Sequence, residues 1–295
     1  MTWILDVGGV EVALLAIIAL GAAVGFIAGM FGVGGGFLLI PLLHVVLNVP
    51  LQLVVGAVLC QTIAISLGSF LRYRTMGHAE TRLDILLLGG SILGVLVGSE
   101  LHHYLGQLGS VEVLGKSIAI SDMIVSSTFC LIYFGVAVIL WVKEAASIGD
   151  HISPGPLSKI RLPPHLDLPV AGLQNVSAPL ICYIGLALGI FSGLLGIGGG
   201  VILMPIMLYG FGFNIRKAAG TGIVMILVVS LIGTLRHSLA GNVHLGFAVT
   251  LMVGSALAAQ VGAGLTHRLH PTFLRKALAT MIVAANIALL LKVFR

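Results

Sequence analysis

Two glycine-rich stretches have a composition and a position in the chain that suit the binding of a ligand. Residues 29–36 read Gly-Met-Phe-Gly-Val-Gly-Gly-Gly, and residues 193–200 read Gly-Leu-Leu-Gly-Ile-Gly-Gly-Gly. Each stretch interrupts an apolar run and is followed by a proline, Pro41 or Pro205. Glycines tolerate positive φ and let a ligand approach the backbone, and a helix that starts after such a break presents free N–H groups and the positive end of its dipole. This combination is a generic anion site.

The same glycines could instead serve only to let helices cross closely. Packing does not demand three consecutive glycines twice, so we favour the anion site. A nucleotide P-loop is excluded because no Gly-Lys-Ser/Thr follows either stretch. The predicted backbone ligands are Gly32, Gly34, Gly35 and Gly36 in the first stretch and Gly196, Gly198, Gly199 and Gly200 in the second.

Polar side chains inside apolar runs are costly in a membrane and therefore suggest function. Hydroxyl and amide groups could complete a cavity for a polar solute, although serine and threonine can equally bond to their own helix backbone. The predicted cavity residues are Gln61, Thr62, Ser66, Thr221 and Ser230. Arg72 and Arg236 would either attract anions at the two mouths of a pathway or extend from helix ends to the membrane surface.

No other set of residues predicts catalysis. The chain has 10 histidines, but His102–His103 and His267–His270 lie at the ends of apolar runs without a carboxylate at ligand spacing. We therefore expect no metal and no cofactor. No catalytic triad, paired carboxylates or H-E-x-x-H occurs, so an enzyme is not expected. No carboxylate lies in the middle of an apolar run, where it could carry protons.

The composition requires a membrane as the surroundings of these residues. Hydrophobic residues make up 58% of the 295 positions, charged residues make up 8%, and the mean hydropathy is +1.16. So few charged residues could not cover the surface of a protein of this size in water. Lipid must therefore contact most of that surface. The net charge is +5, but the basic residues stand singly in short loops, which argues against a nucleic-acid partner.

The elements that position the candidate residues are ten apolar runs, which predict an all-α polytopic membrane protein. The second run of each half is glycine-led and, at about 21 Å as a helix, is shorter than the hydrocarbon core. The runs cover residues 11–31, 36–49, 53–71, 83–105 and 119–142, then 176–195, 200–213, 217–240, 245–266 and 273–293. We expect a first repeat at 11–142, a cytoplasmic linker at 143–175 and a second repeat at 176–295.

The two halves are repeats of each other. A constant offset, which takes Gly25 to Gly189, aligns Gly25–Leu105 with Gly189–Leu269 without gaps. Five crossings per half would invert the second half relative to the first, and loop charge supports this. If all ten runs cross, most loop lysines and arginines fall on one side, whereas they divide more evenly if the two short runs are re-entrant and each half crosses four times. The ten-crossing arrangement places this basic side in the cytoplasm and both termini outside.

At these residues the sequence resembles the TauE/SafE family of sulfite and organosulfonate exporters. The resemblance spans nearly the whole chain and rests on the two glycine-rich stretches, their prolines and Ala218-Ala219-Gly220-Thr221-Gly222. It implies export of sulfite, sulfoacetate or a similar small sulfur oxyanion across the inner membrane of a bacterium. The first half departs from the pattern, because it reads Val54-Val55-Gly56-Ala57-Val58 without the Gly-Thr. This departure predicts an asymmetric site.

Three functions are consistent with this reading. The first is a transporter working by alternating access, which could run uncoupled because exit of a monoanion from a negative interior is favoured by about 2.3 kcal/mol per 100 mV. The second is an anion channel with the same lining. The third is a membrane subunit that transports nothing. The sequence specifies no oligomeric state.

Overall fold

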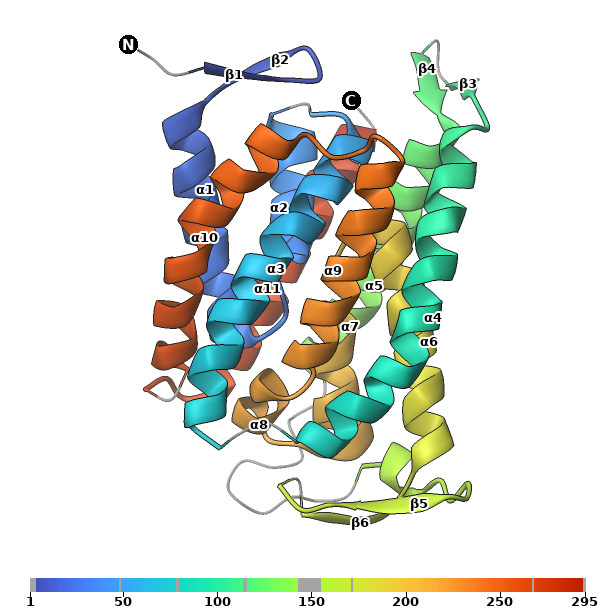
Figure 1. Cartoon of the computed structure of the whole chain (residues 1–295), viewed down its shortest axis with the longest axis vertical. Coiled ribbons are helices and arrows are strands. Elements are labelled where there is room, and N and C mark those ends of the chain that lie inside the picture. The colour runs from blue at the N-terminus through green and yellow to red at the C-terminus, as the bar shows by residue number, and fades with distance from the viewer. Residues whose placement is uncertain are drawn as a thin grey trace.

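The computed structural model describes residues 4–47, 49–77, 80–113, 116–142, 155–170, 172–266 and 268–293. Within this part, eight helical segments are long and apolar enough to cross a membrane, and two shorter apolar helices accompany them. The helices form one bundle (Figure 1). Large apolar side chains such as Leu131 and Leu257, which are 76% and 72% exposed, cover its outside. The prediction of a polytopic helical membrane protein is confirmed.

The first half contains five helical segments and two hairpins. Its elements are β1 (Ile4–Val7), β2 (Val10–Ala13), α1 (Leu14–Phe31), α2 (Gly36–Pro41), α3 (Leu51–Thr75), α4 (Thr81–Gly106), β3 (Ser110–Val113), β4 (Lys116–Ala119) and α5 (Ile120–Val142). The short α2 continues into a π-helical turn at Leu42–Val46. This change follows Pro41, which has no N–H to donate to the helix ladder.

The second half repeats this order after the linker. Residues 143–154 of the predicted linker lie outside the described part, and the rest holds a 3₁₀ turn (Leu157–Lys159), β5 (His165–Leu168) and the start of β6 (Leu173–Ser177). The helices are α6 (Ala178–Leu195), α7 (Gly200–Pro205) with a π-helical turn (Ile206–Phe211), α8 (Ile215–Gly220), α9 (Ile223–Leu239), α10 (Leu245–Leu265) and α11 (Pro271–Val293).

The glycine breaks fall where the sequence predicts them. Helix α1 ends at Gly32 with φ 64°, and α6 ends at Gly196 with φ 75°. Each glycine N–H donates to a carbonyl in the last turn, and a residue with a side chain rarely adopts such a φ. The next helix then starts at Gly36 or Gly200. The repeat alignment therefore relates helix bounds as well as residue types.

Two features differ from the prediction. The run predicted at 217–240 is not one helix, because Thr221 and Gly222 separate α8 from α9, whereas α3 is continuous. The residue Gly222 has φ 90°, which a helix cannot contain. In addition, three short antiparallel hairpins lie at helix ends, and the all-α prediction did not include them.

Glycine ridges hold the long helices together. Helix α1 packs against α10, and α6 packs against α4, so the first helix of each half packs on the fourth helix of the other half. A Cβ built on Gly25 would lie 2.6 Å from Cα of Ser255, and one on Gly94 would lie 2.9 Å from Cα of Gly189. At these positions the absence of a side chain lets the paired helices cross closely.

Equivalent helices run in opposite directions in Figure 1. Helices α1 and α3 run from the upper to the lower end of the view, while α6 and α9 run upward. The hairpins β1–β2 and β3–β4 lie at the upper end, together with the last turns of α11, and β5–β6 lies at the lower end.

Candidate functional site

The two glycine breaks contact each other inside the bundle. A Cβ built on Gly36 would lie 2.7 Å from Cα of Ile197, and one built on Gly200 would lie 2.7 Å from Cα of Val33. Of the eight predicted glycine ligands, all but the half-buried Gly32 are buried. The starts of α2 and α7 are therefore brought together by direct backbone packing, as an anion site shared by both halves requires.

A layer of two side chains covers both breaks. A Cβ built on Gly34 would lie 3.3 Å from Cγ2 of Thr62 and 3.7 Å from Cγ2 of Ile226. The corresponding distances from Gly198 are 3.0 and 3.3 Å. The repeat alignment relates Thr62 on α3 to Ile226 on α9. Two repeat-related methyl groups thus close the centre, and Ile226 was missed because an apolar residue in an apolar run carries no signal.

Two of the predicted cavity residues place buried polar atoms without partners beside the breaks. Within the described part of the chain, the Oε1 atom of Gln61 and the Oγ atom of Ser230 have no hydrogen-bond partner, and both residues are 0% exposed. Built Cβ atoms on Gly35 and Gly198 would lie 3.2 Å from Gln61 Oε1 and 3.6 Å from Ser230 Oγ, respectively. The Ser230 hydroxyl is free to donate to an anion that entered between the breaks.

Three other predicted cavity residues lie in different surroundings. The Thr62 hydroxyl donates to the carbonyl of Val58 at 2.7 Å, so it satisfies its own helix and turns its methyl group to the breaks. Ser66 is buried on α3, one turn further along. Thr221 lies between α8 and α9, where its hydroxyl accepts from the N–H of Glu80 at 3.2 Å.

The break between α8 and α9 is held by a carboxylate that the sequence analysis passed over. The N–H of Gly222 donates to Asp84 Oδ1 at 2.6 Å. Asp84 Oδ2 has no partner among the residues that the structure describes, and Asp84 is 1% exposed. Asp84 lies in the first turn of α4, where an acidic residue normally faces water. Its equivalent in the other half is Ala248, which suits the unbroken α3. The predicted asymmetry between the halves is therefore present at this position.

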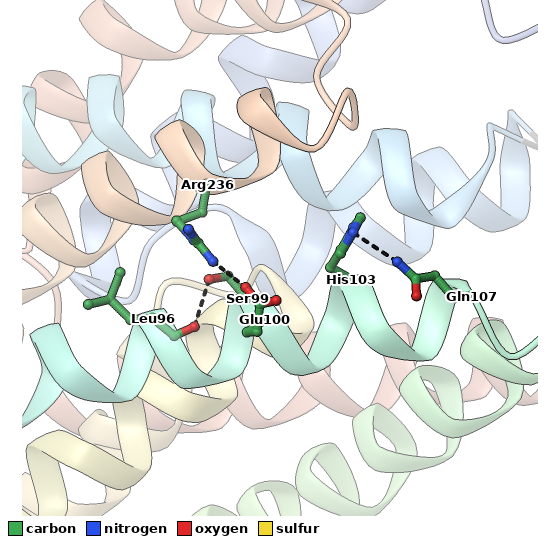
Figure 2. A network of polar contacts seen from close by, with 6 residues as sticks. All are labelled: Leu96, Ser99, Glu100, His103, Gln107 and Arg236. Carbon is green, nitrogen blue, oxygen red and sulfur yellow. Dashed lines mark hydrogen bonds and ion pairs between the residues drawn. The ribbon is translucent and has the colours of Figure 1, made fainter.

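The two arginines lie at opposite ends of the bundle. Arg236 near the end of α9 forms an ion pair with Glu100 of α4 (Figure 2), and their side chains are 40% and 64% exposed. Arg72 near the end of α3 is exposed and makes no ion pair with any described residue. A Cβ built on Gly264 would lie 3.4 Å from Arg72 Nε. Gly264 is the repeat equivalent of Glu100. At equivalent positions, Arg236 therefore meets a carboxylate and Arg72 meets a glycine.

A cavity of about 250 Å³ lies beside the paired arginine. Its lining is polar where α4 and α9 approach each other, and includes Ser99, Glu100, His103, Arg236, His237 and Asn242. Figure 2 shows Arg236 reaching from α9 toward Glu100, with His103 one turn further along α4. The predicted mouth at Arg236 thus coincides with a concave surface.

Two buried histidines that are distant in the sequence meet behind this cavity. The rings of His102 and His237 pack edge to face with their centroids 4.9 Å apart. They were missed because the histidines were judged by their spacing along the chain. The repeat alignment takes Tyr73 to His237 and His102 to Thr266, but it does not indicate that either pair meets.

Comparison with known proteins places the chain among membrane transporters. The family described as "Sulfite exporter TauE/SafE" matches residues 17–289. The "Probable membrane transporter protein YunE" of Bacillus subtilis is 24% identical, over 80% of this chain and 82% of its own length. A "Probable membrane transporter protein" of Haemophilus influenzae is 26% identical, over 70% of this chain and 67% of its own length.

A third relative is longer than this chain, and no solved structure gives a significant match. The "Probable membrane transporter protein MamO" of Paramagnetospirillum magneticum is 25% identical over 83% of this chain but only 39% of its own length. The family match covers both glycine breaks, both arginines and the α8–α9 break. This chain belongs to the Sulfite exporter TauE/SafE family.

Proposed function

We propose that the protein exports a small sulfur oxyanion, such as sulfite or sulfoacetate, by alternating access. It would sit in the cytoplasmic membrane of a bacterium as ten segments in two inverted repeats, with both termini outside. The anion would bind between the starts of α2 and α7, with Ser230 and Gln61 beside it. The observation that supports this proposal most is the direct contact of the two glycine breaks, which lie at the starts of α2 and α7 inside the bundle.

The arrangement of the helices supports inverted repeats. Equivalent helices run in opposite directions in Figure 1, and each half packs its first helix on the other half's fourth. Loop charge favours the end with β5–β6 as the cytoplasmic side. A movement of one half against the other would therefore open the centre alternately to the two sides.

The closed centre favours a carrier over a channel. Thr62 and Ile226 cover both breaks, and the cavity beside Arg236 is described at one end of the bundle. A carrier passes through such an occluded state in every cycle. The sulfur oxyanion comes from the family description, and the freed N–H groups support the negative charge of the substrate.

Flux measurements on purified full-length protein in liposomes test this proposal. We expect saturable uptake of sulfite or sulfoacetate, a large loss in Ser230→Ala and wild-type uptake in Ser238→Ala. Ser238 is the matched control because it is exposed on the same helix. Flux that rises linearly with anion concentration without saturating, together with ohmic single-channel currents, favours the channel. Correctly folded protein that carries no sulfur oxyanion overturns the proposal and leaves a non-transporting subunit.

A further inference from the structure

Two repeat-equivalent corners of the bundle hold the last carbonyls of α1 and α6. At one corner, Tyr73 of α3 meets Thr266, which directly follows α10. At the other, His237 of α9 meets His102 of α4. The repeat alignment relates Tyr73 to His237 and His102 to Thr266. The same positions thus carry groups of different chemistry.

The Tyr73–Thr266 corner is made of hydroxyl groups. The Tyr73 hydroxyl lies 3.3 Å from the carbonyl oxygen of Gly29, 3.2 Å from that of Met30 and 2.9 Å from Thr266 Oγ1. The Thr266 hydroxyl lies 2.6 Å from the carbonyl oxygen of Met30. The carbonyls in the last turn of a helix lack partners within the helix. These two side chains therefore secure the end of α1 immediately before its glycine break.

The His102–His237 corner makes the equivalent bonds with imidazoles. Nδ1 of His102 lies 2.7 Å from the carbonyl oxygen of Leu194, and Nε2 of His237 lies 3.1 Å from that of Gly193. Gly193 and Leu194 are the repeat equivalents of Gly29 and Met30. A carbonyl oxygen only accepts, so both of these ring nitrogens carry a proton. The second nitrogen of a neutral ring is then a free acceptor.

One such acceptor is buried without a partner. Nε2 of His102 has no hydrogen-bond partner among the described residues, and His102 is 2% exposed. Its neighbour His237 lines the cavity beside Arg236, so one ring of the pair borders this cavity. A proton arriving through this cavity would find an imidazole nitrogen whose other side is already fixed on the end of α6.

We propose that His102 and His237 form a proton-binding site that links anion transport to the pH on the cavity side. This inference rests on the proposed function for its link to transport, but not for proton binding itself. In the closed state both rings are buried. When the end of α6 moves and water enters from the cavity, the pair takes up one proton, so acid on this side favours the open state.

The surroundings of the pair carry charges of both signs. The charged and titratable groups that act on the pair are Asp122 of α5, His103 of α4 and Arg236 of α9. Asp122 attracts a proton, Arg236 repels it, and Glu100 partly neutralises Arg236 through their ion pair. Helix α6 contributes the negative end of its dipole, which favours a cation at this position. Two protonated imidazoles in contact would repel each other.

The other corner cannot bind a proton in this way. A phenol ordinarily titrates at about pH 10, and a threonine hydroxyl does not titrate in water. The device is therefore one-sided, although the bonds to the helix ends are alike. The histidine pair also supplies a coupling group where the sequence showed no carboxylate suited to carrying protons.

The first test measures proton binding without transport. The double variant His102→Thr with His237→Tyr copies the Tyr73–Thr266 corner, so it retains donors for the carbonyls at the end of α6. We would follow hydrogen–deuterium exchange of residues 190–200 in the full-length protein at pH 6 and 7.5, corrected for intrinsic exchange. We expect faster exchange at pH 6 in wild type by about threefold to tenfold, since one bound proton changes an equilibrium at most tenfold per pH unit. If exchange depends on pH equally in wild type and in the double variant, His102 and His237 are not a proton-binding site.

A reciprocal variant guards against misfolding of the first. Tyr73→His with Thr266→His places imidazoles at the other corner. We expect pH-dependent exchange to appear at residues 26–36 in this variant, where wild type shows none. Exchange at that segment that stays independent of pH contradicts the inference, because the same bonds with the same groups would then fail to bind a proton.

The second test measures coupling in liposomes. In wild type, lowering the pH on the cavity side should raise the saturated flux of sulfite or sulfoacetate severalfold. In the His102→Thr, His237→Tyr variant, the same change of pH should not alter the flux. Flux that is insensitive to cavity-side pH overturns the coupling. Exchange that depends on pH, without flux of any sulfur oxyanion, would retain the proton site and reject the proposed function, so the two failures are distinguishable.

Discussion

The ends of α3 and α9 occupy equivalent places in the two halves and each carries an arginine, but the two arginines have different neighbours. Arg236 on α9 is paired with Glu100, whereas Arg72 on α3 lies over Gly264 and pairs with no described carboxylate. Close behind each arginine, the last carbonyls of the neighbouring helix are held by imidazoles in one half and hydroxyls in the other. A repeat that retains its backbone geometry can therefore give its two ends different responses to charge and pH.

The third helices of the halves differ in the same sense. Helix α3 is continuous, while its equivalent is divided at Thr221 and Gly222 and anchored by Asp84. The break requires an acceptor for the N–H of Gly222 inside the bundle, and Asp84 supplies it where the other half has Ala248. The packing that the two halves share thus determines how the helices are arranged, and single polar substitutions make the two halves differ.

The largest effect is expected where the two halves resemble each other most. Gly200→Ala places a Cβ 2.7 Å from Cα of Val33, so the glycine breaks must separate. We expect the free energy of unfolding to fall by about 1–3 kcal/mol and anion flux to be lost. Thermal unfolding in detergent and flux in liposomes measure this.

The control is Gly135→Ala, because a Cβ at that position of α5 meets nothing within 4 Å. We expect wild-type behaviour from it. Wild-type flux from Gly200→Ala would show that close contact of the two breaks is dispensable.

An intermediate effect is expected at the broken helix. Asp84→Ala leaves the N–H of Gly222 without its acceptor and should lower the free energy of unfolding by about 1–3 kcal/mol. Asp84→Asn retains an oxygen at the same place and should cost less. Thermal unfolding of both variants separates the acceptor from the charge. Equal losses in the two would mean that the negative charge, and not the bond to Gly222, holds the break.

The smallest effect on stability is expected at the arginines. Glu100→Gln removes an exposed ion pair and should change the free energy of unfolding by at most about 1 kcal/mol. It should also lower the apparent KM for the anion on the cavity side by a factor of about two to five at low salt, because Arg236 then attracts anions unopposed.

The matched variant transfers the carboxylate to the other half. Gly264→Glu places an acid beside Arg72 and should raise the apparent KM on the opposite side. If neither substitution changes the apparent KM, at low or at high salt, the two arginines take no part in the transport pathway.

Much of the fold follows from local sequence. Apolar runs predicted the long helices, and the glycine stretches with Pro41 and Pro205 predicted two short ones. The break at Thr221–Gly222 was missed because the apolar run continues through it. The hairpins were missed because four-residue strands outside the membrane have too little periodicity to stand out.

The candidate site divides along the same line. Sequence found the glycines, Gln61 and Ser230, since polar or flexible residues inside lipid are costly and stand out. It could not find Ile226, Asp84 or the His102–His237 pair. An isoleucine in an apolar run, an acid at a helix start and two histidines in different halves of the chain carry no local signal.

The membrane class and the places where the chain unwinds could be predicted from local residues, because both depend on the cost of moving local groups into lipid, and aligning the chain with itself revealed the two related halves. Which groups meet could not be predicted in this way. The crossing of each half's first helix over the other half's fourth brought two glycine breaks into contact and placed imidazoles at one helix end and hydroxyls at the other. Contacts of this kind depend on the packing of distant helices, which no local pattern specifies.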